Sequence, residues 1–377
     1  MDSETDSRHI GPRAIRRTSP VFPSFLLPAL IASLLISGCS SAPPDYRPIP
    51  PEPPVIYYPV SVDGKIGYID STGRVVIAPQ FDQGDGFSDA RAIVTWGDYM
   101  VNGKYSRTGR GYINKTGELV LEPDFSDARG FSCELAAVKD RSGVFEDPKW
   151  GFIDKRGVTM IRPAFHDVGD FHEGFAWVKF VKRVFMAVIT TYSYIDMNGR
   201  MISPPVFQSA GDFSEGLAPV GVNNKRGYID TTGTVVIPAS FDQAFLFSEG
   251  LACVRIGSGW GYINRRGEQV IPPRYAGAGT FSDGLAYVVV NSSVGFINHA
   301  DSLVIPPRFD NVLPFSEGLA PVAIGSLWGY CDLTGRIVIE PKFDIAEQFW
   351  HGCARVTAGG HAGYIGRDGS RIWPPTP

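Results

Sequence analysis

Acidic side chains recur at two fixed positions along this chain, and they are the residues that most invite a catalytic interpretation. Paired carboxylates serve as general acid and base, and clustered carboxylate oxygens are ligands for Ca²⁺. The two sets are Asp70, Asp154, Asp196, Asp230 and Asp332, and Glu173, Glu215, Glu249 and Glu317. A catalytic pair needs one special copy, whereas these acids are many and equivalent. We therefore interpret them as turn and capping residues.

Other catalytic and metal-binding patterns give equally little support for an enzyme. The sequence has no phosphate loop, no Gly-x-Ser-x-Gly and no His-Glu-x-x-His. The nearest resemblance to a metal cluster is His166, Asp167, Asp170, His172 and Glu173, for which polar loop residues are the simpler interpretation. We predict no catalytic residues, no metal and no cofactor. The alternative is an enzyme acting on envelope glycans through the acids of one atypical early repeat.

The cysteines form no spacing motif. Beyond Cys39, the chain has Cys133, Cys253, Cys331 and Cys353. The chain contains a repeated sequence phrase, described below, and Cys331 and Cys353 stand where its other copies have Ile and Leu. Both are therefore predicted to be small core residues. Cys253 falls at a position that tolerates many residue types, and we expect it to be an exposed thiol.

A short phrase, Gly-aromatic-Ile-Asp/Asn, returns along the chain and sets its organisation. Nine copies begin at Gly67, Gly111, Gly151, Ser193, Gly227, Gly261, Gly295, Gly329 and Gly363, and the last five intervals are each 34 residues. A fixed period of this length indicates a repeat architecture. Apolar residues make up 44% of the chain, enough for a core, and the net charge of -4 gives no general attraction to nucleic acid.

Each copy is predicted to contain three short strands. Counting the first Gly as position 0, Asp or Asn at +3 and Gly at +6 form a turn, and an apolar run closed by Pro follows. Aromatic residues at +14 and +20 enclose a loop with one helical turn. Ala at +25 and Val at +27 share one sheet face, while the varied position +26 suggests that the opposite face is open. This final strand pairs with the Gly-aromatic-Ile strand of the next copy.

Several of these positions together resemble the bacterial WG-repeat (KWG) family. The resemblance rests on Trp150-Gly151, Trp260-Gly261, Trp328-Gly329 and the phrase Phe-Ser-Glu-Gly-Leu-Ala, and it covers about residues 60–377. It implies an all-β repeat protein, often secreted or tethered to a membrane, and it brings no catalytic residues.

The predicted fold is all-β, with nine tandem units of about 34 residues over residues 57–377. We expect three-stranded antiparallel units in an elongated, curved repeat array. The alternative is a closed, propeller-like ring, which nine units would make larger than the usual 4–8 blades.

The N-terminal segment is interpreted as an export signal. Arg16 and Arg17 precede the apolar run Val21–Ile36, and Ser37-Gly38-Cys39 ends it in the manner of a bacterial lipobox. We predict a signal peptide over residues 1–38, lipidation of Cys39 and a Pro-rich linker over residues 39–56. The alternatives are an ordinary signal peptide or a single anchoring helix. The protein is expected in the cell envelope, at the periplasmic face of the outer membrane.

Three connections between repeats are longer than the others, and they are the candidate binding surface. They span Thr95–Arg110, Lys139–Trp150 and Lys179–Tyr192, with nine cations against four acids. The candidate residues are Trp96, Lys104, Arg107, Arg110, Lys139, Arg141, Lys149, Lys179, Lys182 and Arg183. We predict a cationic, aromatic platform for an acidic protein or a polyanionic glycan. The alternatives are that these cations only aid solubility, or that the protein is a spacer without a ligand.

Overall fold

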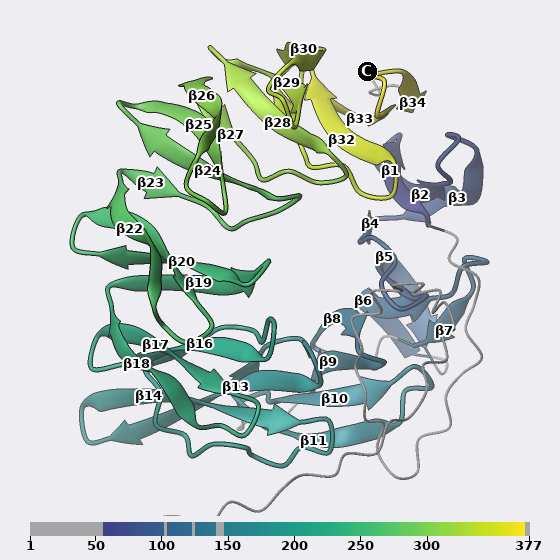
Figure 1. The fold of residues 1–377 in the computed structure, drawn as a ribbon. Coiled ribbons are helices and arrows are strands. Elements are labelled where there is room, and N and C mark those ends of the chain that lie inside the picture. Colours follow the sequence, from purple (N-terminus) through teal and green to yellow (C-terminus); the bar gives the residue numbers. More distant parts are fainter. Residues whose placement is uncertain (1–55, 102–103, 123–124, 141–146, 374–377) are drawn as a thin grey trace, which may run out of the picture. The chain divides into compact units, whose positions relative to one another are not determined.

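The computed structural model describes residues 56–101, 104–122, 125–140 and 147–373. All of them belong to the second of two units of the chain, Gly38–Pro377. Within these residues the chain forms antiparallel β-sheets joined in sequence order (Figure 1). We number the sheets 1 to 9 along the chain.

The strands divide among the sheets as follows. Sheet 1 contains β1 (Tyr58–Val62), β2 (Lys65–Ile69) and β3 (Val75–Phe81). Sheet 2 contains β4 (Gln83–Gly84), β5 (Ala92–Val101), β6 (Lys104–Ile113) and β7 (Leu119–Leu121). Sheet 3 contains β8 (Asp127–Ser132), β9 (Leu135–Lys139), β10 (Trp150–Asp154) and β11 (Thr159–Phe165). Sheet 4 contains β12 (Asp167–Val168), β13 (Phe175–Val184) and β14 (Ala187–Asp196). Sheet 5 contains β15 (Ser209–Ala210), β16 (Leu217–Val222), β17 (Lys225–Asp230) and β18 (Val235–Phe241). Sheet 6 contains β19 (Gln243–Ser248), β20 (Leu251–Ile256), β21 (Gly259–Asn264) and β22 (Gln269–Tyr275). Sheet 7 contains β23 (Gly277–Ala278), β24 (Leu285–Val290), β25 (Ser293–Asn298) and β26 (Leu303–Phe309). Sheet 8 contains β27 (Asn311–Val312), β28 (Leu319–Ile324), β29 (Leu327–Asp332) and β30 (Ile337–Phe343). Sheet 9 contains β31 (Ile345–Ala346), β32 (Cys353–Ala358), β33 (His361–Gly366) and β34 (Arg371–Trp373).

Each sheet takes strands from two sequence repeats, as the repeat pattern predicts. In sheet 5, Ala218 pairs with Ile229 and Val220 with Gly227, so the end of one copy forms a hairpin with the start of the next. The predicted three-stranded meander is therefore correct in register. Seven of the nine sheets in the described residues add a fourth strand, which in most of them has only two residues.

Glycine at position 0 is required by a close approach of two strands. A Cβ at Gly227 would lie 2.5 Å from the Ile237 carbonyl oxygen, where the pairing of β17 with β18 shifts register. Ser193 is the exception at this position. There the outer strand is reduced to isolated bridges, and the Ser193 hydroxyl is buried near the Ser203 carbonyl oxygen, 2.5 Å away. Sheet 4 consequently has three strands.

A buried aromatic residue at position +1 joins each sheet to the next one. Tyr228 of sheet 5 is fully buried, its ring centroid lies 4.9 Å from that of Phe247, and its hydroxyl donates to the Phe245 carbonyl oxygen at 2.7 Å. Both partners belong to sheet 6. The same hydrogen bond recurs from Tyr68, Tyr112, Tyr194, Tyr262 and Tyr330 to the backbone 17 residues ahead.

The Ser-Glu-Gly turn forms a second link between neighbouring sheets. The Ser214 hydroxyl donates to the Phe247 carbonyl oxygen at 2.7 Å, and the Glu215 carboxylate accepts from the Gly250 backbone N–H at 3.0 Å. Equivalent serines and acids repeat these bonds farther along the chain. The phrase recurs because it holds one sheet against the next.

The first and last sheets contact each other, which closes a propeller-like ring (Figure 1). Tyr58 stands where sheet 5 has Ala218, and its ring lies 5.4 Å from Tyr364 of sheet 9. The Tyr364 hydroxyl donates to the Pro59 carbonyl oxygen at 3.0 Å, and the Tyr58 hydroxyl donates to that of His351 at 2.9 Å. The last sheet has no following repeat, so the first one completes its packing.

The structure confirms the all-β repeat fold in its closed, propeller-like form, and the elongated array is wrong. The loop predicted between positions +14 and +20 contains the short fourth strand instead of a helical turn. The face at position +26 is not open, because the neighbouring sheet covers it. Cys253 at this position of sheet 6 is fully buried in a cluster with Ala278 and Phe281 of sheet 7.

Two glycines with the same backbone conformation provide a test of the closure. Gly73 and Gly174 both have a φ of 85°, but only at Gly73 would a Cβ meet the last sheet, 2.2 Å from the Ile372 carbonyl oxygen. Both Ala substitutions incur the strain of a positive φ, about 1 kcal/mol. We expect Gly73→Ala to lower the free energy of unfolding by roughly 1–3 kcal/mol more than Gly174→Ala, measured by urea denaturation. Equal losses would contradict the closure.

Candidate functional site

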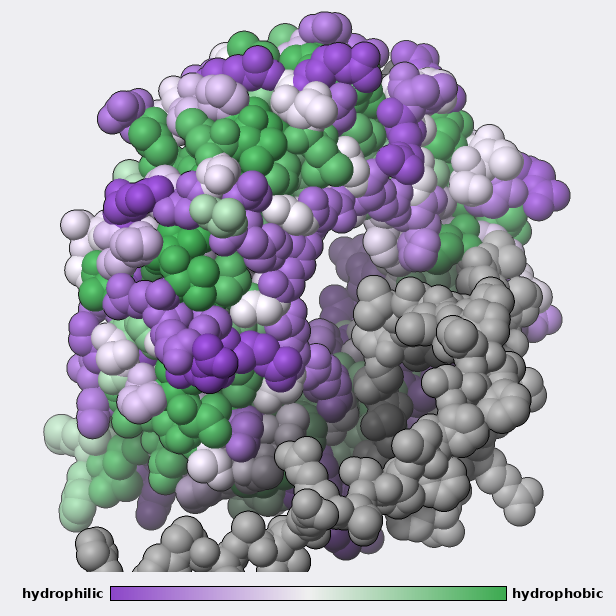
Figure 2. All heavy atoms as spheres, in the orientation of Figure 1, coloured by the Kyte–Doolittle hydropathy of each residue, from purple (hydrophilic) through white to green (hydrophobic). Residues whose placement is uncertain are grey.

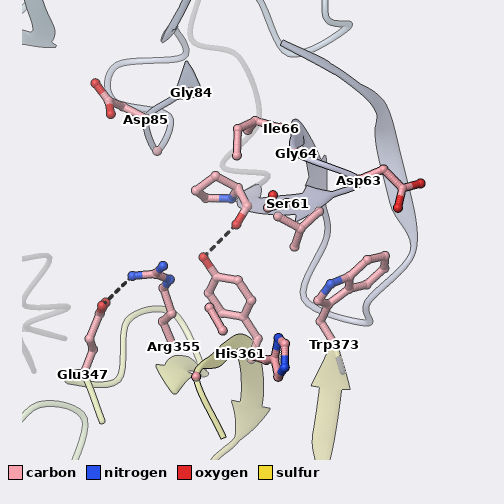
Figure 3. Close-up of a pocket in the computed structure, with 16 residues that line it drawn as sticks. Ser61, Asp63, Gly64, Ile66, Gly84, Asp85, Glu347, Arg355, His361 and Trp373 are labelled. Carbon is pink, nitrogen blue, oxygen red and sulfur yellow. Dashed lines mark hydrogen bonds and ion pairs between the residues drawn. The ribbon is translucent and has the colours of Figure 1, made fainter. Parts of the chain in front are cut away.

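A cavity of about 870 Å³ lies at the seam where sheets 1 and 9 meet, beside the start of sheet 2. We call it the seam pocket. Its polar and aromatic lining comes from the turns and strand ends of these sheets and includes Asp63, Asp85, Glu347, Arg355, His361 and Trp373 (Figure 3).

The charged groups of the seam pocket are partly engaged with each other. Arg355 Nη1 lies 3.0 Å from Glu347 Oε1, and the Tyr364 hydroxyl donates to Pro59. Trp373 Nε1 is buried and has no hydrogen-bond acceptor among the described residues. The pocket thus offers an indole, an imidazole and a guanidinium for stacking and hydrogen bonding.

The carboxylates of the pocket do not face one another. In Figure 3, Asp63 and Asp85 stand on opposite sides of the opening with their carboxylates turned outward, and Glu347 points toward Arg355. This arrangement favours recognition of a ligand by several separate groups over chemistry that requires two adjacent carboxylates.

Two of the predicted platform residues, Lys149 and Lys179, lie near His166, which stands between sheets 3 and 4. The His166 backbone N–H donates to the Lys179 carbonyl oxygen at 3.1 Å, and its Nδ1 accepts from the Val181 N–H at 3.2 Å. Burial lowers the pKa of His166, the positive charges of Lys149 and Lys179 lower it further, and the negative charge of Asp147 opposes them. Residues of two long connections, cations and an acid, thus surround this imidazole.

Lys139, another predicted residue, lies beside Trp150 together with Arg129, which was not among the predicted residues. The guanidinium carbon of Arg129 lies 4.8 Å from the centre of the indole, and Lys139 Nζ lies 5.9 Å from it. Trp150 is buried, so its indole supports the two cations from within the sheet.

Trp96 and Arg110 are occupied by contacts within the ring. Trp96 packs edge-on against Phe81, with ring centroids 5.3 Å apart. Arg110 forms an ion pair with Asp127 of the next sheet and approaches the Ala128 carbonyl oxygen at 3.4 Å. These contacts leave the guanidinium half-exposed at the boundary between sheets 2 and 3.

The remaining predicted residues are placed as follows. Lys182 and Arg183 are exposed on β13. Lys104 and Arg107 lie on β6, opposite Val101 and beside Thr108 in a hairpin of ten-residue strands. Arg141 lies outside the described residues. The binding role of the whole set stays a prediction.

The repeated acids have structural roles. Asp230 Oδ1 accepts from the backbone N–H groups of Thr232 and Thr234 at 2.9 and 3.1 Å, which is the predicted turn. Asn264 makes the same bonds in its copy, so the turn does not require a charge. The glutamates accept hydrogen bonds from the next sheet instead of capping their own turn, because that sheet is adjacent in the ring.

The residues near His166 that resemble a metal cluster have other partners in the structure, and the expectation of an exposed thiol fails. His166 and Asp167 are engaged with Val181 and Arg129, and His172 lies 3.9 Å from Asp212. Cys253 is fully buried, and burial raises the pKa of its thiol to about 12. The expectation of an exposed Cys253 is wrong because position +26 packs against the neighbouring sheet.

Sequence reasoning missed the seam pocket. Its residues come from the first and last repeats, which meet only when the ring closes. Arg355 was a usable signal, because it occupies position +26, which is apolar in the other copies. An exposed arginine at a position that is buried or half-buried in the other copies marks a place where the repeat environment changes.

These features define a β-propeller-like repeat scaffold. The model of the WG-containing repeat matches eight segments, residues 66–105, 111–142, 150–180, 192–225, 227–259, 260–292, 295–328 and 328–360. The chain belongs to this family, as its Trp-Gly pairs indicated. No curated protein matches the chain.

The chain is similar to solved structures at low sequence identity. A crystal structure of a eukaryotic initiation factor has 14% identity and a TM-score of 0.50, covering 81% of this chain and 91% of that one. The acylaminoacyl peptidase of Pyrococcus horikoshii has 12% identity and a TM-score of 0.35, covering 71% of this chain and 55% of that one.

The predicted signal, the lipidated Cys39 and the linker lie outside the described residues. Among the residues that are described, there is no helix of the length and apolarity that a membrane crossing requires.

The turn carboxylates predict a sensitivity to acid. Hydrogen bonds within its own turn, above all from the Thr72 hydroxyl, lower the pKa of Asp70 to about 2, and equivalent bonds lower the pKa of Asp230 and Asp332. A lowered pKa contributes stability above the unfolded value, near 3.8, and the contribution is lost as the pH falls toward 2. We expect Asp70→Asn, Asp230→Asn and Asp332→Asn together to flatten the fall of Tm between pH 5 and about 2.

Thermal unfolding followed by circular dichroism across this pH range measures the effect. Asp63→Asn, in the β1–β2 hairpin turn, controls for the loss of a negative charge. An unchanged slope in the triple variant would show that these turns do not contribute.

Proposed function

We propose that this protein is a non-catalytic binding scaffold, anchored in the cell envelope through Cys39. Its cationic surface on sheets 2 to 4 would hold an acidic protein or a polyanionic glycan of the cell wall. The observation that supports this most is the row of cations on β13, where Lys179 is followed by the exposed Lys182 and Arg183.

Electrostatics make this surface distinct from the rest of the molecule. The chain as a whole has a net charge of -4, so a local excess of cations attracts an anionic partner to one region. Most acids in the repeats are engaged in turns or between sheets. Lys139, whose Nζ lies 5.9 Å from the buried Trp150 ring, adds a further cation to this region, while Arg129 is already paired with Asp167.

Charge reversal tests the cationic surface. We expect the parent protein to be retained on anionic envelope material and released by salt, because exposed charges are screened. Replacing Lys104, Arg107, Lys179, Lys182 and Arg183 with Glu should abolish retention. Replacing Arg265 and Arg371, exposed cations on other sheets, should leave it unchanged. Retention of the five-fold variant at the parent's salt concentration would refute the proposal.

The anchor has a separate test. Cys39→Ala removes the thiol that would be acylated, and we expect the protein to move from the membrane pellet to the soluble fraction after cell lysis. Mass spectrometry of the parent should show the added lipid on Cys39. Continued pelleting of Cys39→Ala would contradict lipid anchoring and leave the cationic surface untouched.

A further inference from the structure

The β13–β14 hairpin ends in an apolar turn that has no counterpart in the other described hairpins. Its strands are ten residues long, against six in sheet 5, and Val184 pairs with Ala187. Phe185 and Met186 therefore form a two-residue turn, and both side chains are fully exposed, at 105% and 103%. Figure 2 shows hydrophobic residues gathered at this end of the hairpin, at the lower left.

The repeat supplies its own comparison for this turn. At the tip of the equivalent hairpin in other copies, the two-residue turns of the described residues are Asp63-Gly64, Asn223-Asn224, Gly257-Ser258, Asn291-Ser292, Gly325-Ser326 and Gly359-Gly360. These types favour the positive φ that such turns need. Phe185 adopts a φ of 52°, which is unfavourable for a bulky residue. Two large apolar side chains thus stand where local conformation favours small polar ones.

Cations lie directly behind the apolar tip. Lys182 is paired with Ile189, and Arg183 is paired with Val188. Since cross-strand partners share a face and successive residues alternate, each face of the hairpin has one cation and one apolar side chain. Val188 and Ile189 are exposed at 63% and 47%. The two strands contain no acid before Asp196.

We propose that this hairpin tip inserts into the interfacial layer of an anionic lipid membrane. Phe185 and Met186 would enter the boundary between headgroups and acyl chains, and Lys182 and Arg183 would remain at the level of the lipid phosphates. A protein partner would bury one face of the hairpin. A fluid lipid surface surrounds the tip and matches the equal distribution of apolar and cationic groups on both faces.

This inference goes beyond the proposed function, because it assigns the tip a lipid surface and does not depend on a protein or glycan partner. It adds a second, reversible membrane contact that would fix the orientation of the ring. A lipid chain alone, by contrast, leaves a tethered domain free to rotate.

Vesicle co-sedimentation tests the proposal, with the full chain carrying Cys39→Ala in every variant so that acylation is absent. The apolar run Val21–Ile36 then contributes equally throughout. Phe185→Asn with Met186→Gly restores favoured turn residues, so it should fold. We expect it to bind mixed phosphatidylglycerol and phosphatidylcholine vesicles about tenfold more weakly than the parent. Lys182→Glu with Arg183→Glu should weaken binding by a similar factor.

Controls separate the tip from other apolar surface. Ile324→Thr alters an exposed apolar residue next to the turn of another hairpin and should bind like the parent. The fluorescence emission of a polarity-sensitive dye attached to Ala187→Cys should shift to shorter wavelength when anionic vesicles are added. The emission of the same dye attached to Ser258→Cys should not shift. Equal binding by the Phe185/Met186 variant, or a dye at residue 187 that stays in water, would overturn the proposal. Neither result would affect retention on anionic envelope material by the other cations.

Discussion

The packing of one buried aromatic ring against the next sheet is the interaction on which the whole structure depends. A sheet of three or four short strands cannot bury its central residues alone, so every sheet needs a neighbour. Tyr228 shows how the need is met: its ring contacts Phe247, and its hydroxyl satisfies a backbone carbonyl of the same neighbour. Tyr364 of the last sheet has no following repeat to pack against. Tyr58 of the first sheet supplies the missing aromatic ring.

This constraint separates the residues that build the ring from those that are free to vary. Both faces of the central strands are covered, so exposed differences between repeats concentrate in the hairpins and at the seam. Arg355 and the Phe185-Met186 turn are two such departures from the repeat. Comparison among copies within one chain therefore identifies candidate functional positions without any related sequence.

Much of the fold could be predicted from the sequence because the repeat fixes strand register. The two-residue spacing of Ala218 and Val220 placed both on one face, and the structure pairs them as expected. The short fourth strand was not predictable, since two residues such as Ser209–Ala210 have no periodicity to detect. Ring closure depends on a small rotation at each sheet, which is a property of packing and not of local pattern. The candidate site was predicted less well than the fold, because the seam pocket forms only when the ring closes.

The distance between the two end sheets is the measurement that tests the closed ring most directly. Asp63→Cys and His361→Cys, both in the lining of the seam pocket, provide sites for two spin labels. The distance between the labels can be measured by pulsed electron paramagnetic resonance. The ring predicts one narrow distribution on the order of 20 Å, the scale of a single cavity. An open array of nine sheets about 10 Å apart would place the labels roughly 80 Å from each other. A distribution centred at such long distances would contradict the closure.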